Sequence, residues 1–384
     1  MTLRIGMFSW ESMHSVRVGG ISPHVTFLAE SLARKGHEVH IFTRPGWMRD
    51  YDFINGVHYQ RCPHDHSGGI IQQMNSMCES MVDRFYAVEH LFGEFDVLHL
   101  HDWHPVLAMH QIKNGRDIPW VMTYHSTEYG RNGNVNHDSP ECKEISHREW
   151  LGGYESSQII TTSPHMVEEL KFVYQFLDDK TFIVPNGVNS IRKDVDAGEV
   201  KKRYSIHPLA PLILFAGRMT YQKGPDLLVS SINQVLDNHW DAKFVFIGEG
   251  DMRHACQDMA YMQGVSDSCR FLGYVDDADL VDLMNACDIF CAPSRNEPFG
   301  IVILEAWSAS KPVVGTHAHG IIDDFVDGIR AHFSPESIAW CLNALLNEPE
   351  TRERMGEKGR AKVKREFSWD RIGDETLKVY REVL

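Results

Sequence analysis

The stretch Ser294-Arg-Asn-Glu-Pro-Phe-Gly-Ile-Val-Ile-Leu-Glu-Ala306 organises this chain. It follows the apolar run 288–293 and precedes a helical pattern that ends near residue 312. An apolar run, a short polar loop and a helical pattern in that order predict a strand, a turn and a helix N-terminus. α/β proteins bind anions at such a place.

The turn itself has the residue types of an anion-binding loop. Pro298 suits a first helical turn, and Gly300 lets a ligand approach the backbone closely. We expect free N–H groups here to point at a phosphate or sugar oxygen, namely those of Phe299, Gly300 and Ile301.

Two carboxylates, Glu297 and Glu305, bracket this turn. If both were helical, they would lie about 12 Å apart along the axis at about 1.5 Å per residue. That separation is too long for one acid/base pair, but it suits a grip on the two ends of an elongated ligand such as a sugar nucleotide. The alternative is an ordinary amphipathic helix with two solvated glutamates.

Composition sets limits on the class of protein. The 384 residues include 38 Lys and Arg against 53 Asp and Glu, a net charge of −15 that disfavours a nucleic-acid partner. The N-terminus lacks a signal-peptide pattern, no window resembles a transmembrane segment, and the eight cysteines form no Cys-x-x-Cys pair. We therefore expect a cytoplasmic protein, of two domains by its length.

Strand and helix patterns alternate along the whole chain, which predicts parallel sheets covered by helices on both faces. The alternation breaks at 186–189 and restarts with the strand 212–216. We place the domain boundary at this break, with a first domain 1–187 and a second domain that begins at 188.

The second domain opens with Gly217-Arg-Met-Thr-Tyr-Gln-Lys-Gly224, directly after a strand and before a helix. Arg218 and Lys223 at the carboxyl end of a strand face the crevice where such sheets bind ligands. Two cations there would neutralise a diphosphate, although a basic surface turn is the plainer interpretation.

Three segments of the first domain have a similar character. Gly19 and Gly20 lie between a first strand and a helix that we expect to start at Ser22 and Pro23, an arrangement that can receive a phosphate. His101-Asp102-Trp-His104 and Thr123-Tyr-His125-Ser126 end two consecutive strands. His99 and His101 alternate on one strand face and could supply two metal ligands, but we expect no metal site.

Gly-Arg-x-x-x-x-Lys-Gly, followed some 75 residues later by Glu-Pro-Phe-Gly-x-x-x-x-Glu, resembles the retaining GT-B glycosyltransferases of group 1 (families 4 and 5), which include glycogen and starch synthases. The resemblance implies two Rossmann-like doubly wound domains that face each other across a cleft. It also implies that a last helix, 369–384, returns to the N-terminal, acceptor-side domain 1–187. The nucleotide-sugar-binding domain is then 188–368.

The resemblance also implies roles for individual residues. Arg218 and Lys223 hold the donor's diphosphate, Glu297 touches the hydroxyls of the transferred sugar, and Glu305 takes the ribose hydroxyls. Asp102 and His125 line the cleft near the sugar and the acceptor, and Gly20 presents its N–H to the phosphates. The segment at Tyr274 clasps the nucleobase. The chain departs from the synthases at Arg17, where they have Lys, and at Asn189, where they have Asp.

We therefore predict a hexosyltransferase that moves a hexosyl group, expected to be glucosyl, from a donor such as ADP-glucose or UDP-glucose to a glycan, as in α-1,4-glucan elongation. Transfer to another glycoconjugate, or to a disaccharide of the trehalose type, is the alternative. A phosphorylase, an epimerase and a non-catalytic nucleotide-binding protein also remain open. Gly19-Gly20 lacks the Gly-x-Gly-x-x-Gly pattern, which disfavours a nicotinamide-dependent oxidoreductase. We expect no cofactor and no metal; the base, the acceptor and the oligomeric state stay open.

Overall fold

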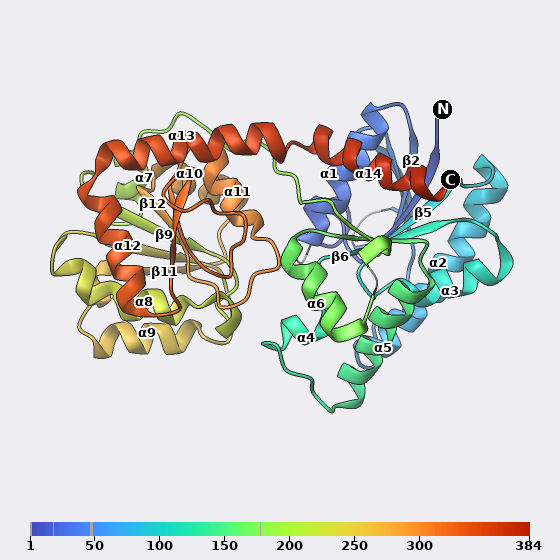
Figure 1. The fold of residues 1–384 in the computed structure, drawn as a ribbon, viewed down its shortest axis with the longest axis horizontal. Coiled ribbons are helices and arrows are strands. Elements are labelled where there is room, and N and C mark those ends of the chain that lie inside the picture. The colour runs from blue at the N-terminus through green and yellow to red at the C-terminus, as the bar shows by residue number, and fades with distance from the viewer. Residues whose placement is uncertain (1, 18, 47–48, 177) are drawn as a thin grey trace. The chain divides into compact units, whose positions relative to one another are not determined.

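The computed structural model describes residues 2–17, 19–46, 49–176 and 178–384. Val18, within the predicted glycine-bearing loop of the first domain, lies outside the described residues. The chain divides into two compact units (Figure 1), Met1–Gly187 with Trp369–Leu384, and Val188–Ser368. Each unit is built around its own sheet.

The first unit holds an eight-stranded sheet in the order β3-β4-β2-β1-β5-β6-β7-β8. Its strands are β1 (Arg4–Phe8), β2 (Glu38–Thr43), β3 (Tyr51–Ile54), β4 (Val57–Arg61), β5 (Val97–His101), β6 (Trp120–Tyr124), β7 (Gln158–Thr161) and β8 (Thr181–Ile183). All neighbours pair parallel except β3 and β4. The sequence interpretation missed this hairpin, whose turn residues Asn55 and Gly56 both have positive φ, 52° and 84°.

Helices cover both faces of this sheet, as the alternation predicts. They are α1 (Ile21–Arg34), α2 (Ile70–Phe92), α3 (Val106–Gly115), α4 (Glu128–Arg131), α5 (Pro140–Glu155), α6 (Pro164–Tyr174) and α14 (Trp369–Val383). α2, α3, α5 and α6 contribute to one apolar layer, and α1 and α14 to the other. α1 starts at Ile21 with Gly20 as its N-cap. The prediction that it starts at Ser22 and Pro23 is therefore wrong by two residues.

The C-terminal helix α14 is an integral part of the first unit and packs beside α1 (Figure 1). Ser31 Oγ on α1 donates a hydrogen bond to the Trp369 carbonyl at 2.8 Å. The buried Tyr380 hydroxyl lies 2.7 Å from His99 Nδ1 on β5. The chain therefore leaves the first unit after Gly187 and returns to it at Trp369.

The second unit holds a six-stranded, fully parallel sheet in the order β11-β10-β9-β12-β13-β14. Its strands are β9 (Leu212–Ala216), β10 (Lys243–Ile247), β11 (Cys269–Gly273), β12 (Ile289–Ala292), β13 (Val313–Thr316) and β14 (Gly328–Ala331). The sequence interpretation ended this sheet at β13 and missed β14. A parallel sheet buried on both faces explains why these strands are nearly continuous apolar runs.

Helices again form two layers. α8 (Pro225–Leu236), α9 (Arg253–Met262) and α12 (Pro335–Asn347) pack on one face, and α7 (Ala197–Arg203), α10 (Asp277–Ala286), α11 (Ile301–Ser308) and α13 (Pro349–Glu366) on the other. No helix in the described part of the chain combines the length and the apolar character that a membrane span requires.

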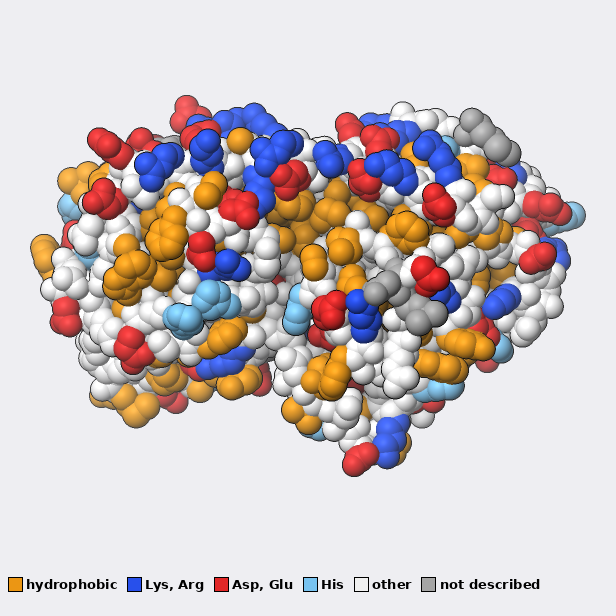
Figure 2. Space-filling model, viewed as in Figure 1, with side chains coloured by type: hydrophobic (Ala, Val, Ile, Leu, Met, Phe, Trp, Pro, Cys, Tyr) orange, Lys and Arg blue, Asp and Glu red, His pale blue; other side chains and the backbone are white. Residues whose placement is uncertain are grey.

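On the face shown in Figure 2, acidic and basic side chains are interspersed.

Candidate active site

Two glycine-bearing loops meet at the carboxyl ends of β9 and β10 in the second unit. The N–H of Met219, in the loop after β9, donates to the Glu249 carbonyl at 2.8 Å. Gly248 has φ +125°, and a Cβ there would collide with the Gly217 carbonyl oxygen. Gly248 and Gly250 are thus required for the close approach of the two loops, a role that the sequence interpretation missed.

The loop after β9 also lies against the stretch 294–306, which contains Glu297 and Glu305. Gly224 has φ +65°, and a Cβ there would collide with the Pro293 carbonyl oxygen. The Arg295 N–H donates to the Gln222 carbonyl at 2.8 Å. The two predicted motifs are therefore in direct contact.

This contact brings Lys223 and Glu297 together. Lys223 Nζ lies 2.5 Å from Glu297 Oε2, and the two side chains are 22% and 7% exposed. Burial opposes the charge on Glu297, but the Lys223 ammonium and the Phe299 N–H outweigh it and lower the pKa of this carboxyl. Glu297 is therefore ionised at neutral pH, and Lys223 is already paired before any ligand binds.

His319 is a buried part of this site that the sequence interpretation did not identify. Its Nε2 lies 3.0 Å from the Ala292 carbonyl, while its Nδ1 is buried without a hydrogen-bond partner in the described structure. Burial lowers the pKa of His319 to about 4. A Cβ on Gly300, which has φ +91°, would lie only 3.1 Å from this Nδ1, so a neutral imidazole fills the space beneath the glycine.

The turn before α11 differs from the prediction in two respects. α11 begins at Ile301 with Gly300 as its N-cap, so Pro298 and Glu297 precede the helix. The N–H of Phe299, which we expected to be free for a ligand, donates to the Glu297 carboxylate, because that carboxylate turns back into its own loop. The main chain at Gly300 and Ile301 lies at the N-terminus of α11, as predicted.

The remaining predicted residues of the second unit lie at or near the surface. Arg218 is exposed, with Nη2 3.4 Å from Gln222 Oε1. Tyr274, directly after β11, is 79% exposed. Glu305 is partly buried on the second turn of α11. Arg218 can therefore reach an anionic ligand with little rearrangement.

In the first unit, the glycines before α1 differ from the prediction. The Gly19 N–H, expected to be free for a phosphate, donates to Glu11 Oε2 at 3.0 Å. Gly20 is the N-cap of α1 with no side-chain cap. Glu11, on the loop after β1, was not singled out from the sequence.

Asp102 and His125 lie together at the ends of the neighbouring strands β5 and β6, as predicted. Asp102 Oδ1 accepts the main-chain N–H of His125 at 2.7 Å, so this carboxylate holds the backbone and not the ring. Asp102 itself has φ +58°, a left-handed conformation that Asp tolerates. Burial raises the pKa of Asp102 to about 6.

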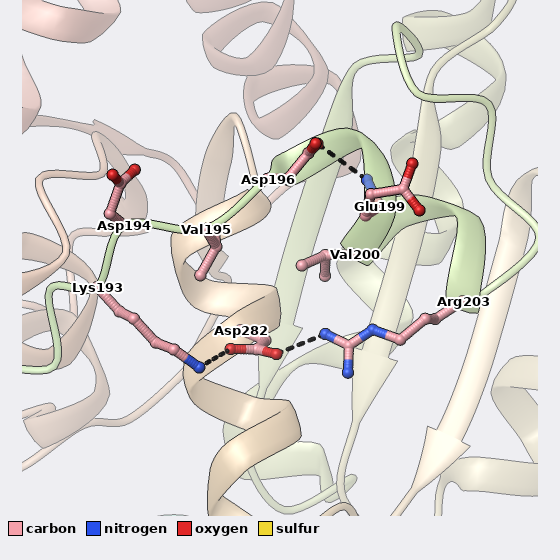
Figure 3. Close-up of a pocket in the computed structure, with 8 residues that line it drawn as sticks. All are labelled: Lys193, Asp194, Val195, Asp196, Glu199, Val200, Arg203 and Asp282. Atoms are coloured by element: carbon pink, nitrogen blue, oxygen red, sulfur yellow. Dashed lines mark hydrogen bonds and ion pairs between the residues drawn. The ribbon is translucent and has the colours of Figure 1, made fainter.

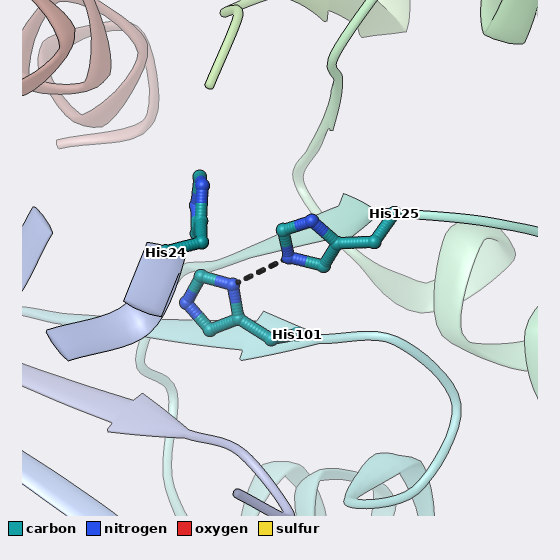
Figure 4. A group of neighbouring side chains, drawn as sticks. All are labelled: His24, His101 and His125. Carbon is teal, nitrogen blue, oxygen red and sulfur yellow. Dashed lines mark hydrogen bonds between the residues drawn. The ribbon is translucent and has the colours of Figure 1, made fainter. Parts of the chain in front are cut away.

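The ring of His125 belongs to a group of three histidines (Figure 4). His101 Nδ1 lies 3.2 Å from His125 Nε2, and His24 from α1 packs against both rings. The predicted partner His99 is excluded, because its two nitrogens bond Tyr380 and Thr123. One nitrogen from each of His24, His101 and His125 lies within 4.8 Å of the others, so this group could hold a metal ion.

A hollow lies elsewhere in the second unit (Figure 3). It is lined by Lys193, Asp194, Val195, Asp196, Glu199, Val200, Arg203 and Asp282. Asp282 accepts from Lys193 at 2.7 Å and from Arg203 at 2.5 Å. Both cations that line the hollow are thus neutralised by one carboxylate, and we assign it no role.

Comparison with known proteins identifies the class of site. The family profile "Glycosyl transferases group 1" matches residues 197–362, and "Glycosyltransferase Family 4" matches residues 18–192. An uncharacterised glycosyltransferase of Methanocaldococcus jannaschii is 35% identical over 99% of this chain and 98% of its own length. A glycogen synthase of Mycobacterium tuberculosis is 26% identical over 98% of this chain and 94% of its own.

Among solved structures, the sucrose-phosphate synthase of Thermosynechococcus elongatus superposes with a TM-score of 0.84 at 21% identity, covering 99% of this chain and 98% of that one. That likeness concerns the fold, which is GT-B. The profiles and the relatives confirm the family that the two motifs predict. The chain belongs to the group 1 glycosyltransferases.

Proposed function

We propose that this protein is a retaining, metal-independent hexosyltransferase that moves a glucosyl group from a nucleoside-diphosphate sugar to a growing α-1,4-glucan. The observation that carries the proposal is the contact between the two motifs, which brings Glu297 against the loop that holds Lys223 and the exposed Arg218. The similarity to a glycogen synthase over 98% of this chain supports the choice of acceptor.

The proposed donor follows from the charges of the site. Arg218 and Lys223 would bind the diphosphate, and the main chain at Gly300 and Ile301 would add the N-terminus of α11. Because Lys223 already contacts Glu297, a phosphate that binds it is held beside a carboxylate able to accept sugar hydroxyls. Glu305 would take the ribose hydroxyls and the segment at Tyr274 the base.

The proposed step is front-face transfer. The bond from the anomeric carbon to the β-phosphate oxygen breaks, and the acceptor hydroxyl forms a new bond on the same face. The hydroxyl proton moves to the departing phosphate, so no covalent sugar–enzyme intermediate is formed. Arg218 and Lys223 would supply most of the rate, since negative charge develops on the leaving phosphate. We propose no catalytic metal, because these cations already face that charge.

The test is a panel of ADP-, UDP- and GDP-glucose, each incubated with and without glycogen while nucleoside diphosphate release is measured. We expect release with at least one donor to depend on glycogen. The product linkage, read by ¹H NMR of the anomeric proton, should be α. Release that needs inorganic phosphate, or a β product, would contradict the proposal.

The free cysteines of the described chain, nearly all buried, are consistent with a cytoplasmic enzyme.

A further inference from the structure

The ring of His125 is held by its neighbours in the first unit and not by its own strand alone. Its Nε2 faces His101 Nδ1 at 3.2 Å, and its ring packs edge-on against His24 with centroids 4.5 Å apart. Its main-chain N–H is fixed by Asp102 at 2.7 Å. Backbone and ring are therefore both constrained, and Nε2 is occupied by a second histidine (Figure 4).

All three rings are neutral at physiological pH. Burial lowers the pKa of His125 to about 3 and the pKa values of His24 and His101 well below the ordinary value. A neutral imidazole carries one N–H and one lone pair, and the partner of one nitrogen decides which is which. The contact between His101 and His125 therefore sets what the other nitrogen of His125 offers to a ligand.

Two arrangements of the shared proton are available. In the first, His101 Nδ1–H donates to His125 Nε2, and His125 carries its own proton on Nδ1. In the second, His125 Nε2–H donates to His101 Nδ1, and His101 must carry its proton on Nε2. His101 Nε2 is buried and has no hydrogen-bond partner among the described residues.

His24 does not provide an acceptor for a proton on His101 Nε2. Its Nδ1 lies 2.7 Å from Asn186 Oδ1, which makes Nδ1 the protonated nitrogen and leaves a lone pair on Nε2. That Nε2 is likewise buried without a partner, so it does not accept from His101. The second arrangement would bury an N–H with no acceptor, which native structures avoid more strictly than an unpaired acceptor.

We infer that His101 is a positioning residue that fixes His125 as its Nδ1–H tautomer, so that His125 presents a hydrogen-bond donor to the ligand. The inference rests on the proposed function for the identity of that ligand, a sugar hydroxyl or phosphate oxygen. His125 is partly exposed, and because its Nε2 faces His101, Nδ1 is the ring nitrogen left for a ligand. His101 itself is fully buried, so it would act on a ligand only through His125.

The decisive measurement uses the wild-type protein. Long-range ¹H–¹⁵N correlation spectra of protein labelled with [¹⁵N]histidine distinguish the two neutral tautomers, and the His125→Gln variant identifies the His125 signals by their loss. We expect the Nδ1–H pattern at pH 7. A His125 in the Nε2–H form, or an even mixture, overturns the inference whether or not any donor supports turnover.

Variants then test the role of His101. His101→Leu removes the donor, so we expect a mixed His125 tautomer and a kcat lowered by about 10-fold or more, with the donor KM nearly unchanged. His101→Asn, whose amide can donate, should recover part of kcat. The matched control is His58→Leu, since His58 stacks on His40 at 4.4 Å in the same unit and has no part in the site.

The possible outcomes separate the two ideas. An unchanged tautomer in a folded His101→Leu overturns the role of His101, while glucan transfer by the wild type would still stand. Absence of turnover with every donor overturns the proposed function, while the wild-type spectrum still decides the tautomer. If His101→Leu does not fold, that spectrum remains the test.

Discussion

Removing the Lys223 side chain should affect both stability and turnover. Lys223→Ala leaves Glu297, which is 7% exposed, without the ammonium that lies 2.5 Å away. Loss of one partner from a fully buried pair costs about 3–5 kcal/mol. Because Lys223 is 22% exposed, water can replace part of its contact. We therefore expect the free energy of unfolding to fall by about 2–3 kcal/mol.

Turnover should fall by about 10²-fold or more, equivalent to about 2.7 kcal/mol in the activation free energy, because a cation facing the leaving phosphate is lost. Arg218→Ala is the matched control. Arg218 is exposed and its contact with Gln222 is long, at 3.4 Å, so its removal should change stability by less than about 0.5 kcal/mol while turnover falls similarly.

Urea unfolding and nucleoside diphosphate release measure the two effects. The double variant Lys223→Ala/Glu297→Gln separates charge from packing, since it removes the stranded carboxylate and should be more stable than Lys223→Ala alone. Unchanged stability in Lys223→Ala would refute the ion-pair reasoning. Near-normal turnover in both single variants would refute the diphosphate assignment.

Four further predictions concern the same two units. Glu305→Ala should mainly raise the donor KM, and Glu297→Ala should mainly lower kcat; equal effects in steady-state kinetics would mean that the roles are misassigned. EDTA should leave activity intact, and a loss restored by Mn²⁺ or Mg²⁺ would contradict metal independence. His125→Ala and Asp102→Ala should bind nucleoside diphosphate nearly normally by calorimetry while transfer falls by about 10²-fold. Because burial raises the pKa of Asp102 to about 6, the folded state binds this proton more tightly, so this group's contribution to stability declines as pH rises through about 4 to 6. Asp102→Asn, which tolerates the left-handed backbone, should abolish that decline in unfolding experiments; a persistent decline would assign it to another group.

Much of the second unit follows from its sequence. β9 lies in the predicted range, and α8 follows the loop 217–224 as predicted, because a short apolar run, a Gly-Pro junction and helical spacing are local signals. The β3–β4 hairpin was missed although Asn55-Gly56 is a strong turn signal, because its two strands are only 4 and 5 residues long. Secondary structure is therefore predicted well where a periodic run of residues and its start or stop signal occur together.

The interior of the site is less predictable for a physical reason. Glu11 and Glu297 turn back onto the N–H groups of their own loops, which removes Gly19 and Phe299 as donors for a ligand. Neither turn is visible in periodicity, since loop conformation depends on such side-chain contacts. The meeting of His24 with His125 depends on the order of strands and helices across about a hundred residues, which no local spacing encodes.

The return of the chain at Trp369 makes the first unit discontinuous, with the whole second unit inserted into it. During synthesis the ribosome therefore completes residues 188–368 before it supplies α14. Until then Ser31 and His99 lack their partners at Trp369 and Tyr380, and the apolar layer that α14 shares with α1 is uncovered. The first unit can therefore complete its fold only after the second unit has been synthesised, which reverses the usual N-terminal-first order of domain folding on the ribosome.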